Sequence, residues 1–170
     1  LYASTKFSRD NARVFSTVAN ARYDQNVYSG AEDESFNSLF GGGISAESGS
    51  EVLRENEDDK LATHTGLKAM EVDDNEQTFK YTTINLQGKK HFIASVWTNN
   101  SFGRIKYKVN GGEEQTSNPA SDSKKADNWY LLDVLIPVTG ATSLEVWCEA
   151  EGGTCRFDDF RLHPHDAAMT

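Results

Sequence analysis

Short runs of alternating apolar and polar residues, separated by turn residues, constrain the fold of this chain more than any other feature. In RIKYKVNGG, which starts at Arg104, the apolar side chains face one way, the two lysines face the other, and Asn-Gly supplies a turn. Such runs recur along the sequence, whereas apolar stripes of helical period are nearly absent. The pattern predicts an all-β protein.

The alternating runs predict about nine strands and two packed sheets. The expected strands span 26–29, 43–46, 67–72, 78–86, 91–99, 104–109, 129–137, 143–149 and 155–162. The run LLDVLIP (131–137) is apolar on both faces except at Asp133, which is typical of a strand covered on both sides. The predicted fold class is therefore all-β, a two-sheet antiparallel β-sandwich.

Three segments lack this alternation. Residues 1–22 are polar, and we interpret them as a lead-in from an upstream region, with an early strand at 13–17. The acidic run 50–60 is predicted to be a solvated loop, and 111–128 a long polar loop, which is either a binding loop or simply mobile. We expect the sandwich domain at 23–163 and an exit linker at 164–170.

The length and net charge of the chain exclude several classes of protein. The 170 residues suit one domain, and because the chain begins with Leu1 we expect a monomeric module within a longer protein. The net charge of −9 argues against nucleic acid and anionic membranes, which attract basic surfaces, and is compatible with calcium. No window approaches 18 uncharged apolar residues, so no membrane insertion is expected.

The two cysteines leave two alternatives open. Cys148 and Cys155 lie at facing ends of an expected hairpin whose tip is EAEGGT. A cross-strand disulfide is geometrically feasible there in an extracytoplasmic protein, and the other interpretation is two small buried thiols.

The stretch CRFDDFRLHP (155–164) sets two carboxylates, Asp158 and Asp159, inside a run that otherwise has the pattern of a strand. Alternation places Asp158 on the side of Phe160 and Asp159 on the side of Phe157. One acid therefore points where apolar side chains point. Because an isolated buried carboxylate is costly, Asp158 must be paired, hydrogen-bonded or metal-bound.

Four stretches in this order carry a family resemblance: SGAED (29–33), HTGLKAMEV (64–72), HFIASVWTN (91–99) and CRFDDFRLHP. Together they resemble the jelly-roll, galactose-binding-like sandwiches found as carbohydrate-binding modules. They are still more similar to the module that precedes Rhs/YD repeats in surface or secreted proteins of Bacteroidetes-like bacteria. The resemblance spans about residues 20–170 and implies a jelly-roll fold and an extracellular or cell-surface location.

The resemblance also implies a structural calcium ion that joins the first strand, a turn and the last strand. The ligands that match the family's positions are the Gly30 carbonyl, the Glu32 carboxylate, the Thr65 oxygen, the Lys68 carbonyl and the Asp158 carboxylate. Such oxygen ligands are the ones that calcium takes. The alternative is that Asp158 caps backbone amides or pairs with Lys68 without a metal.

No residue pattern singles out a catalytic site. The four histidines are dispersed, lack zinc-site spacing, and are interpreted as surface or turn residues: His64, His91, His163 and His165. Modules of this kind stack sugars on exposed aromatic rings, so the candidate ligand-binding residues are Tyr81, Trp97 and Trp147, although each also suits a core position.

The sequence therefore favours a non-catalytic carbohydrate-binding module of a larger extracellular or surface protein, with a glycan as its partner and structural calcium. The alternative is a structural spacer or adhesion module of an Rhs-like protein without a glycan ligand. Exposure of the three candidate rings discriminates between them, because a spacer has no reason to leave large aromatic rings in water.

Overall fold

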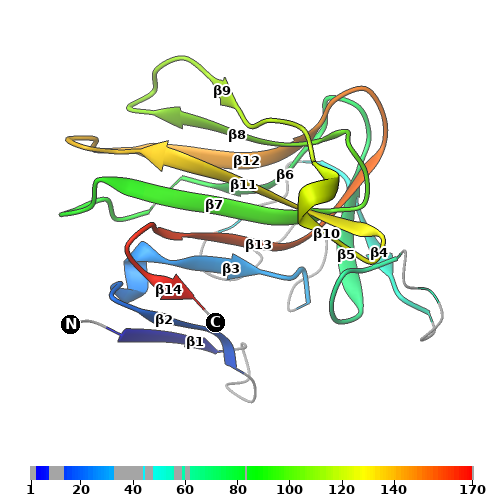
Figure 1. Ribbon diagram of the computed structural model, residues 1–170, viewed down its shortest axis with the longest axis horizontal. Coiled ribbons are helices and arrows are strands. Elements are labelled where there is room, and N and C mark those ends of the chain that lie inside the picture. Colours follow the sequence, from blue (N-terminus) through cyan, green and yellow to red (C-terminus); the bar gives the residue numbers. More distant parts are fainter. Residues whose placement is uncertain are drawn as a thin grey trace.

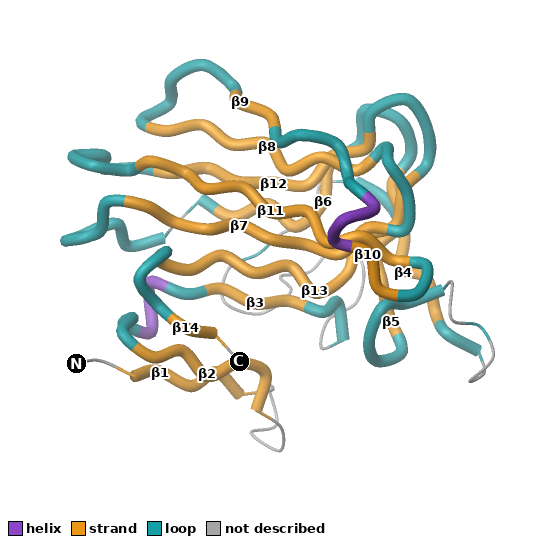
Figure 2. The backbone as a smooth tube through the Cα atoms, in the orientation of Figure 1, coloured by secondary structure: helices purple, strands orange, loops and turns teal. Residues whose placement is uncertain are grey.

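The computed structural model describes residues 3–7, 14–32, 44, 48–55, 59, 62–82 and 84–169. These residues form strands and two short 3-10 turns, Tyr23–Gln25 and Asp122–Lys124 (Figure 2). All strand pairs within the sheets are antiparallel. The predicted all-β fold, an antiparallel sandwich of the jelly-roll type, is confirmed.

The strands form three sheets (Figure 1). The large sheet contains β10 (Lys125–Ala126), β11 (Trp129–Pro137), β7 (His91–Thr98), β13 (Cys155–Pro164), β5 (Lys68–Val72) and β4 (Ser50–Leu53), with β3 (Val27–Ser29) paired to β13. The small sheet contains β6 (Gln77–Tyr81), β12 (Leu144–Ala150), β8 (Gly103–Val109) and β9 (Gln115–Thr116). The N-terminal sheet contains β1 (Ala3–Phe7), β2 (Val14–Ala19) and β14 (Ala168–Met169).

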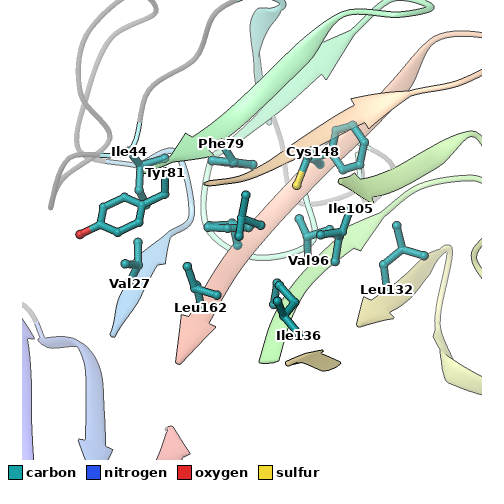
Figure 3. Packing of buried hydrophobic residues seen from close by; sticks show 14 of the residues in the cluster. Val27, Ile44, Phe79, Tyr81, Val96, Ile105, Leu132, Ile136, Cys148 and Leu162 are labelled. Atoms are coloured by element: carbon teal, nitrogen blue, oxygen red, sulfur yellow. The ribbon is translucent and has the colours of Figure 1, made fainter. Parts of the chain in front are cut away.

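The apolar core lies between the large and the small sheet (Figure 3). It follows from alternation, because every second side chain of a central strand points to the same layer: on β7 the buried residues are Phe92, Ala94, Val96 and Thr98. The intervening residues of β7, His91, Ile93, Ser95 and Trp97, lie on the opposite side, called here the outer face of the large sheet.

The N-terminal sheet joins segments that lie at opposite ends of the sequence. β2 pairs with β1 on one side and with β14 on the other. The expected early strand at 13–17 corresponds to β2, and the expected exit linker contains β14. The predicted division at residues 23 and 163 stays a prediction, but the structure links the described residues on both sides of it by strand pairing.

Two sequence predictions about loops are corrected by the structure. The acidic run 50–60 was expected to be a loop, yet its first residues form β4, which is paired only with β5 at an edge of the described large sheet and therefore tolerates polar side chains. Within 111–128, β9 and β10 add short edge pairs. The expected strand 43–46 lies outside the described residues except for Ile44, which is buried.

The outer side of β11 is not covered as the apolar run LLDVLIP predicted. Leu135 is 50% exposed, and Asp133 is exposed too. The prediction was wrong because apolar residues on both faces of a strand do not by themselves show that both faces are covered. In the described residues, no helix is long and apolar enough to cross a membrane.

Cys148 and Cys155 are free, buried thiols. The expected hairpin does not form, because β12 belongs to the small sheet and β13 to the large one, so the chain crosses between sheets after Ala150. The Cys155 Sγ atom lies 2.7 Å from the Thr98 hydroxyl oxygen. Of the two alternatives that the sequence left open, the structure contains the buried thiols.

Candidate functional site

A bulge in β13 brings both aspartates to the outer face of the large sheet. Asp158 pairs with Trp97 and Arg161 pairs with Ser95, so two residues of β13 lie opposite one residue of β7. Asp159 has a left-handed backbone with φ of 52°, which Asp tolerates better than most residues. The predictions that Asp158 lies on the side of Phe160 and Asp159 on the side of Phe157 are therefore both wrong, since the extra residue resets the alternation.

The two carboxylates form a clamp on the turn at residues 62–67. Asp158 Oδ2 accepts hydrogen bonds from the backbone N–H groups of His64, at 2.8 Å, and Thr65, at 3.0 Å. Asp159 accepts hydrogen bonds from the hydroxyls of Tyr28, at 2.6 Å, and Thr65, at 2.9 Å, and its Oδ2 lies 2.7 Å from His64 Nδ1. Asp158 is fully buried and Asp159 is 2% exposed, so these contacts replace the water that the carboxylates lose.

The pKa values of the two carboxyl groups in this clamp are shifted in opposite directions. Burial, and then the charge of Asp159, raises the pKa of Asp158 in spite of its three amide donors. Burial also opposes ionisation of Asp159, but hydrogen bonds from His64, Tyr28 and Thr65 outweigh it and lower the pKa of that carboxyl. Burial first, and then Asp159, raises the pKa of Tyr28 far above its usual range, so the phenol remains a proton donor.

Glu32 holds the other end of the same turn. Its Oε1 atom accepts hydrogen bonds from the backbone N–H groups of Leu67 and Lys68, both at 2.8 Å. Gly66, between the two halves of the turn, has φ of 60°, and a Cβ atom there would overlap the Glu32 carboxylate. The glycine of the HTG sequence is therefore required in this turn, because a carboxylate approaches the backbone at that position.

Of the five predicted calcium ligands, Glu32, Thr65 and Asp158 already form hydrogen bonds with their side-chain oxygens. Glu32 and Asp158 face backbone N–H groups, and Thr65 donates its hydroxyl proton to Asp159. Among the described residues, no group of three or more His, Cys, Asp or Glu side chains is arranged to hold a metal ion. The contacts of Asp158 match the alternative in which it caps backbone amides, and the calcium ion stays a prediction.

Above the clamp, two aromatic rings are stacked. The imidazole of His64 lies parallel to the indole of Trp97, with centroids 4.0 Å apart and an interplanar angle of 15°. Trp129 meets His64 edge-on at 5.9 Å. Since the same residue pair, His64 and Thr65, is fixed by both aspartates, the clamp sets the position of the His64 ring over Trp97.

A pocket of about 210 Å³ opens beside this stack. Its lining residues are Arg54, Thr63, His64, Ala126, Asp127 and Trp129. They come from the chain after β4, the 62–67 turn and the β10–β11 turn, which are far apart in the sequence. The pocket therefore combines aromatic surface with a guanidinium, a carboxylate and a hydroxyl.

The other two candidate rings are covered. Tyr81 is 6% exposed and belongs to the apolar core, where Figure 3 shows it. Trp147 is 2% exposed, although alternation puts it outside the core; its Nε1 donates to Glu149 at 3.1 Å, and the Lys108 ammonium lies 5.5 Å from its ring. Of the three, Trp97 alone is half-buried; it does not line the pocket itself but stacks on His64, which does.

Sequence reasoning missed several residues of this site, namely Tyr28, Arg54, Asp127, Trp129 and Asp159. His64 lies in a turn as expected, but its stacking role was not foreseen. The contact between His64 and Asp159 joins residues 95 positions apart, so no local pattern reveals it. The sequence contains only a weak indication of the left-handed position of Asp159, namely two adjacent aspartates in a strand, which are compatible with a bulge.

No protein-family model and no curated protein matches this sequence. One similar solved structure is BtGH115A, a family GH115 4-O-methyl-α-glucuronidase with specificity for decorated arabinogalactans (15% identity, TM-score 0.49). The similarity covers 71% of this chain, which spans only 17% of the glucuronidase chain.

Two further solved structures are similar over most of their length. TmCBM61, in complex with β-1,4-galactotriose, has 15% identity and a TM-score of 0.47 over 72% of this chain and 87% of that chain. The C-terminal family 22 carbohydrate-binding module of Clostridium thermocellum Xyn10B has 12% identity and a TM-score of 0.49 over 86% and 98%. Similarities of this size carry no argument about function, which must come from the site.

Proposed function

We propose that this chain is a non-catalytic glycan-binding module of a larger extracellular or surface protein. Its binding surface is the pocket beside the stack of His64 on Trp97. The observation that carries the proposal is this juxtaposition: a rigid aromatic pair adjoins Arg54 and Asp127 at a pocket of about 210 Å³. Sugar rings offer an apolar face for stacking and hydroxyls for hydrogen bonds, which is what such a pocket accommodates.

The hydrogen bonding of the acids supports a binding role over catalysis. A general acid or base needs a proton or lone pair directed at the substrate. Asp159 instead accepts hydrogen bonds from the side chains of Tyr28, Thr65 and His64. Asp158 accepts hydrogen bonds from three backbone N–H groups. The two carboxylates therefore act as positioning groups for the turn and its imidazole.

Binding to a panel of immobilised polysaccharides, followed by calorimetry, tests the proposal. Trp97→Ala and His64→Ala should each weaken binding at least about tenfold, equivalent to roughly 1.4 kcal/mol, because both remove part of the aromatic pair. Phe102→Ala is the matched control, since Phe102 is a 39% exposed ring that does not line the pocket.

The outcome also separates the module from a spacer of an Rhs-like protein. Glycan binding that survives Trp97→Ala and His64→Ala would place the site elsewhere. If the folded wild-type chain binds no member of a broad glycan panel, the spacer interpretation stands, and burial of Tyr81 and Trp147 agrees with it.

Structural calcium remains a prediction of the resemblance, to be tested on its own. If calcium holds the turn, millimolar calcium should raise the melting temperature over that in chelator, by an amount that grows with the logarithm of the calcium concentration once the site is saturated. Asp158→Asn should abolish that rise, and Asp133→Asn, an exposed residue of β11, should not. If initially metal-free protein gives equal melting curves in chelator and in millimolar calcium, the calcium prediction is wrong. The turn is then held by the hydrogen bonds of the clamp without an ion.

A further inference from the structure

A second pocket, of about 270 Å³, lies at the far end of the outer face of the large sheet. Its lining residues are Gly88, Lys89, Lys90, His91, His165 and Asp166. It adjoins the N-terminal sheet, because Asn20, at the end of β2, donates to the Asp166 carbonyl at 3.0 Å. The site just described does not include any of these residues.

Strand pairing fixes the two histidines of this pocket side by side. The backbone N–H of His165 donates to the His91 carbonyl at 3.0 Å, and the ring centroids are 6.3 Å apart. The Lys90 carbonyl accepts from the Val138 N–H at 2.8 Å, so the backbone that carries the neighbouring ammonium is held as well. The three side chains thus project from anchored backbone.

The residues that line this pocket carry more positive than negative charge. Lys89 is neutralised by Asp166, whose carboxylate lies 3.1 Å from its ammonium. In the part of the chain that the structure describes, no carboxylate forms an ion pair with Lys90, His91 or His165. Lys90 therefore contributes an uncompensated positive charge to a protein of net charge −9.

We propose that this pocket binds an oxyanion group, a carboxylate or a sulfate, carried by an acidic polysaccharide. Lys90 supplies the charge, and the two imidazoles supply N–H donors, a combination that favours anionic oxygens. The volume lies near the lower end of small-molecule pockets, which suits one charged group with its sugar ring better than a long oligosaccharide.

This oxyanion pocket is separate from the glycan site. His91 and Trp97 stand on the same face of β7, six residues apart, which corresponds to roughly 20 Å along the strand. The proposal deepens the proposed function by adding an acidic-group subsite, but the pocket itself stands independently. A loss at one site need not affect the other.

Imidazole NMR signals give a direct readout in titrations with inorganic sulfate, glucuronate and polygalacturonate, with neutral galactan as the uncharged probe. The signals of His91 and His165 should shift with each anion, while that of His64 should not shift with sulfate. Polygalacturonate that binds more tightly than glucuronate identifies a group borne by a polymer, and equal affinities identify a free small anion. Trp97→Ala should leave the sulfate shifts intact, which separates this pocket from the glycan site.

Charge variants give the control. Lys90→Gln should weaken sulfate binding roughly two- to fivefold. Lys108→Gln removes the same charge from the small sheet and should leave binding unchanged. Absence of shifts at both histidines, or an equal loss in Lys90→Gln and Lys108→Gln, would refute the pocket.

Discussion

Gly66→Ala tests whether the Glu32 carboxylate determines the geometry of the turn that carries His64. The substitution has two separate effects. An alanine at φ of 60° carries a left-handed strain of about 1 to 2 kcal/mol. Its Cβ also overlaps the Glu32 carboxylate and must displace it.

Displacement of Glu32 breaks its two hydrogen bonds to Leu67 N–H and Lys68 N–H, both 2.8 Å long. Hydrogen bonds to charged groups contribute about 1.5 to 3 kcal/mol each, and the lower value applies here because the contact with Leu67 is exposed. The expected loss in the free energy of unfolding is therefore about 4 to 5 kcal/mol, the sum of strain and two bonds.

Gly88→Ala isolates the strain, since Gly88 has φ of 76° and a Cβ there would meet no atom within 4 Å. It should lose only about 1 to 2 kcal/mol in urea unfolding, so the melting temperatures of the two variants should differ by roughly 6 to 12 °C. In a Glu32→Ala background, Gly66→Ala should cost no more than Gly88→Ala. If Gly66→Ala and Gly88→Ala are equally destabilising in the wild-type background, the role assigned to Glu32 is wrong.

Three further outcomes concern buried titratable groups. Asp159 has a lowered pKa in the folded chain, so the stability it contributes is present above about pH 4 and is lost as the pH falls; urea unfolding from pH 3 to 9 should show that Asp159→Asn removes this loss. Asp158 has a pKa raised to about 8, so its contribution is present below about pH 4 and is lost as the pH rises toward 8, a decline that Asp158→Asn should flatten. Burial raises the pKa of Cys155 to about 12, and Cys148 is equally buried, so neither thiol should react with a disulfide reagent at pH 8 before unfolding. A melting temperature that drops in reductant would instead reveal a bridge between them.

Alternation predicted the central strands well because their two sides have different environments. On β7 the buried residues and the outer residues alternate without a break from Phe92 to Trp97. β4 was missed because an edge strand has one partner and carries polar residues that resemble a loop. Periodicity thus reports on strands with one clearly buried side and says little about edges.

The candidate site was less predictable because alternation identifies a side of a strand but not what covers that side. Trp147 lies outside the core as its spacing indicates, yet lysine side chains and Glu149 surround it and leave it 2% exposed. His64 gained its role from Asp159, and the sequence separation of the pair exceeds any local window. Contacts between distant segments depend on the packed fold.

The bulge in β13 explains how one strand serves both proposed sites. Before the bulge, Phe157 points into the core; after it, Phe160 and Leu162 do so again, although an unbroken alternation would send them outward. The extra residue, Asp159, absorbs this change of phase and places a second carboxylate beneath His64. It also keeps His163 and the residues after it in register with β7, so that His165 meets His91. A deletion of Asp159 would restore simple alternation with Phe157, Phe160 and Leu162 all directed to the core, so the bulge is required by the site and not by the packing of the sheet.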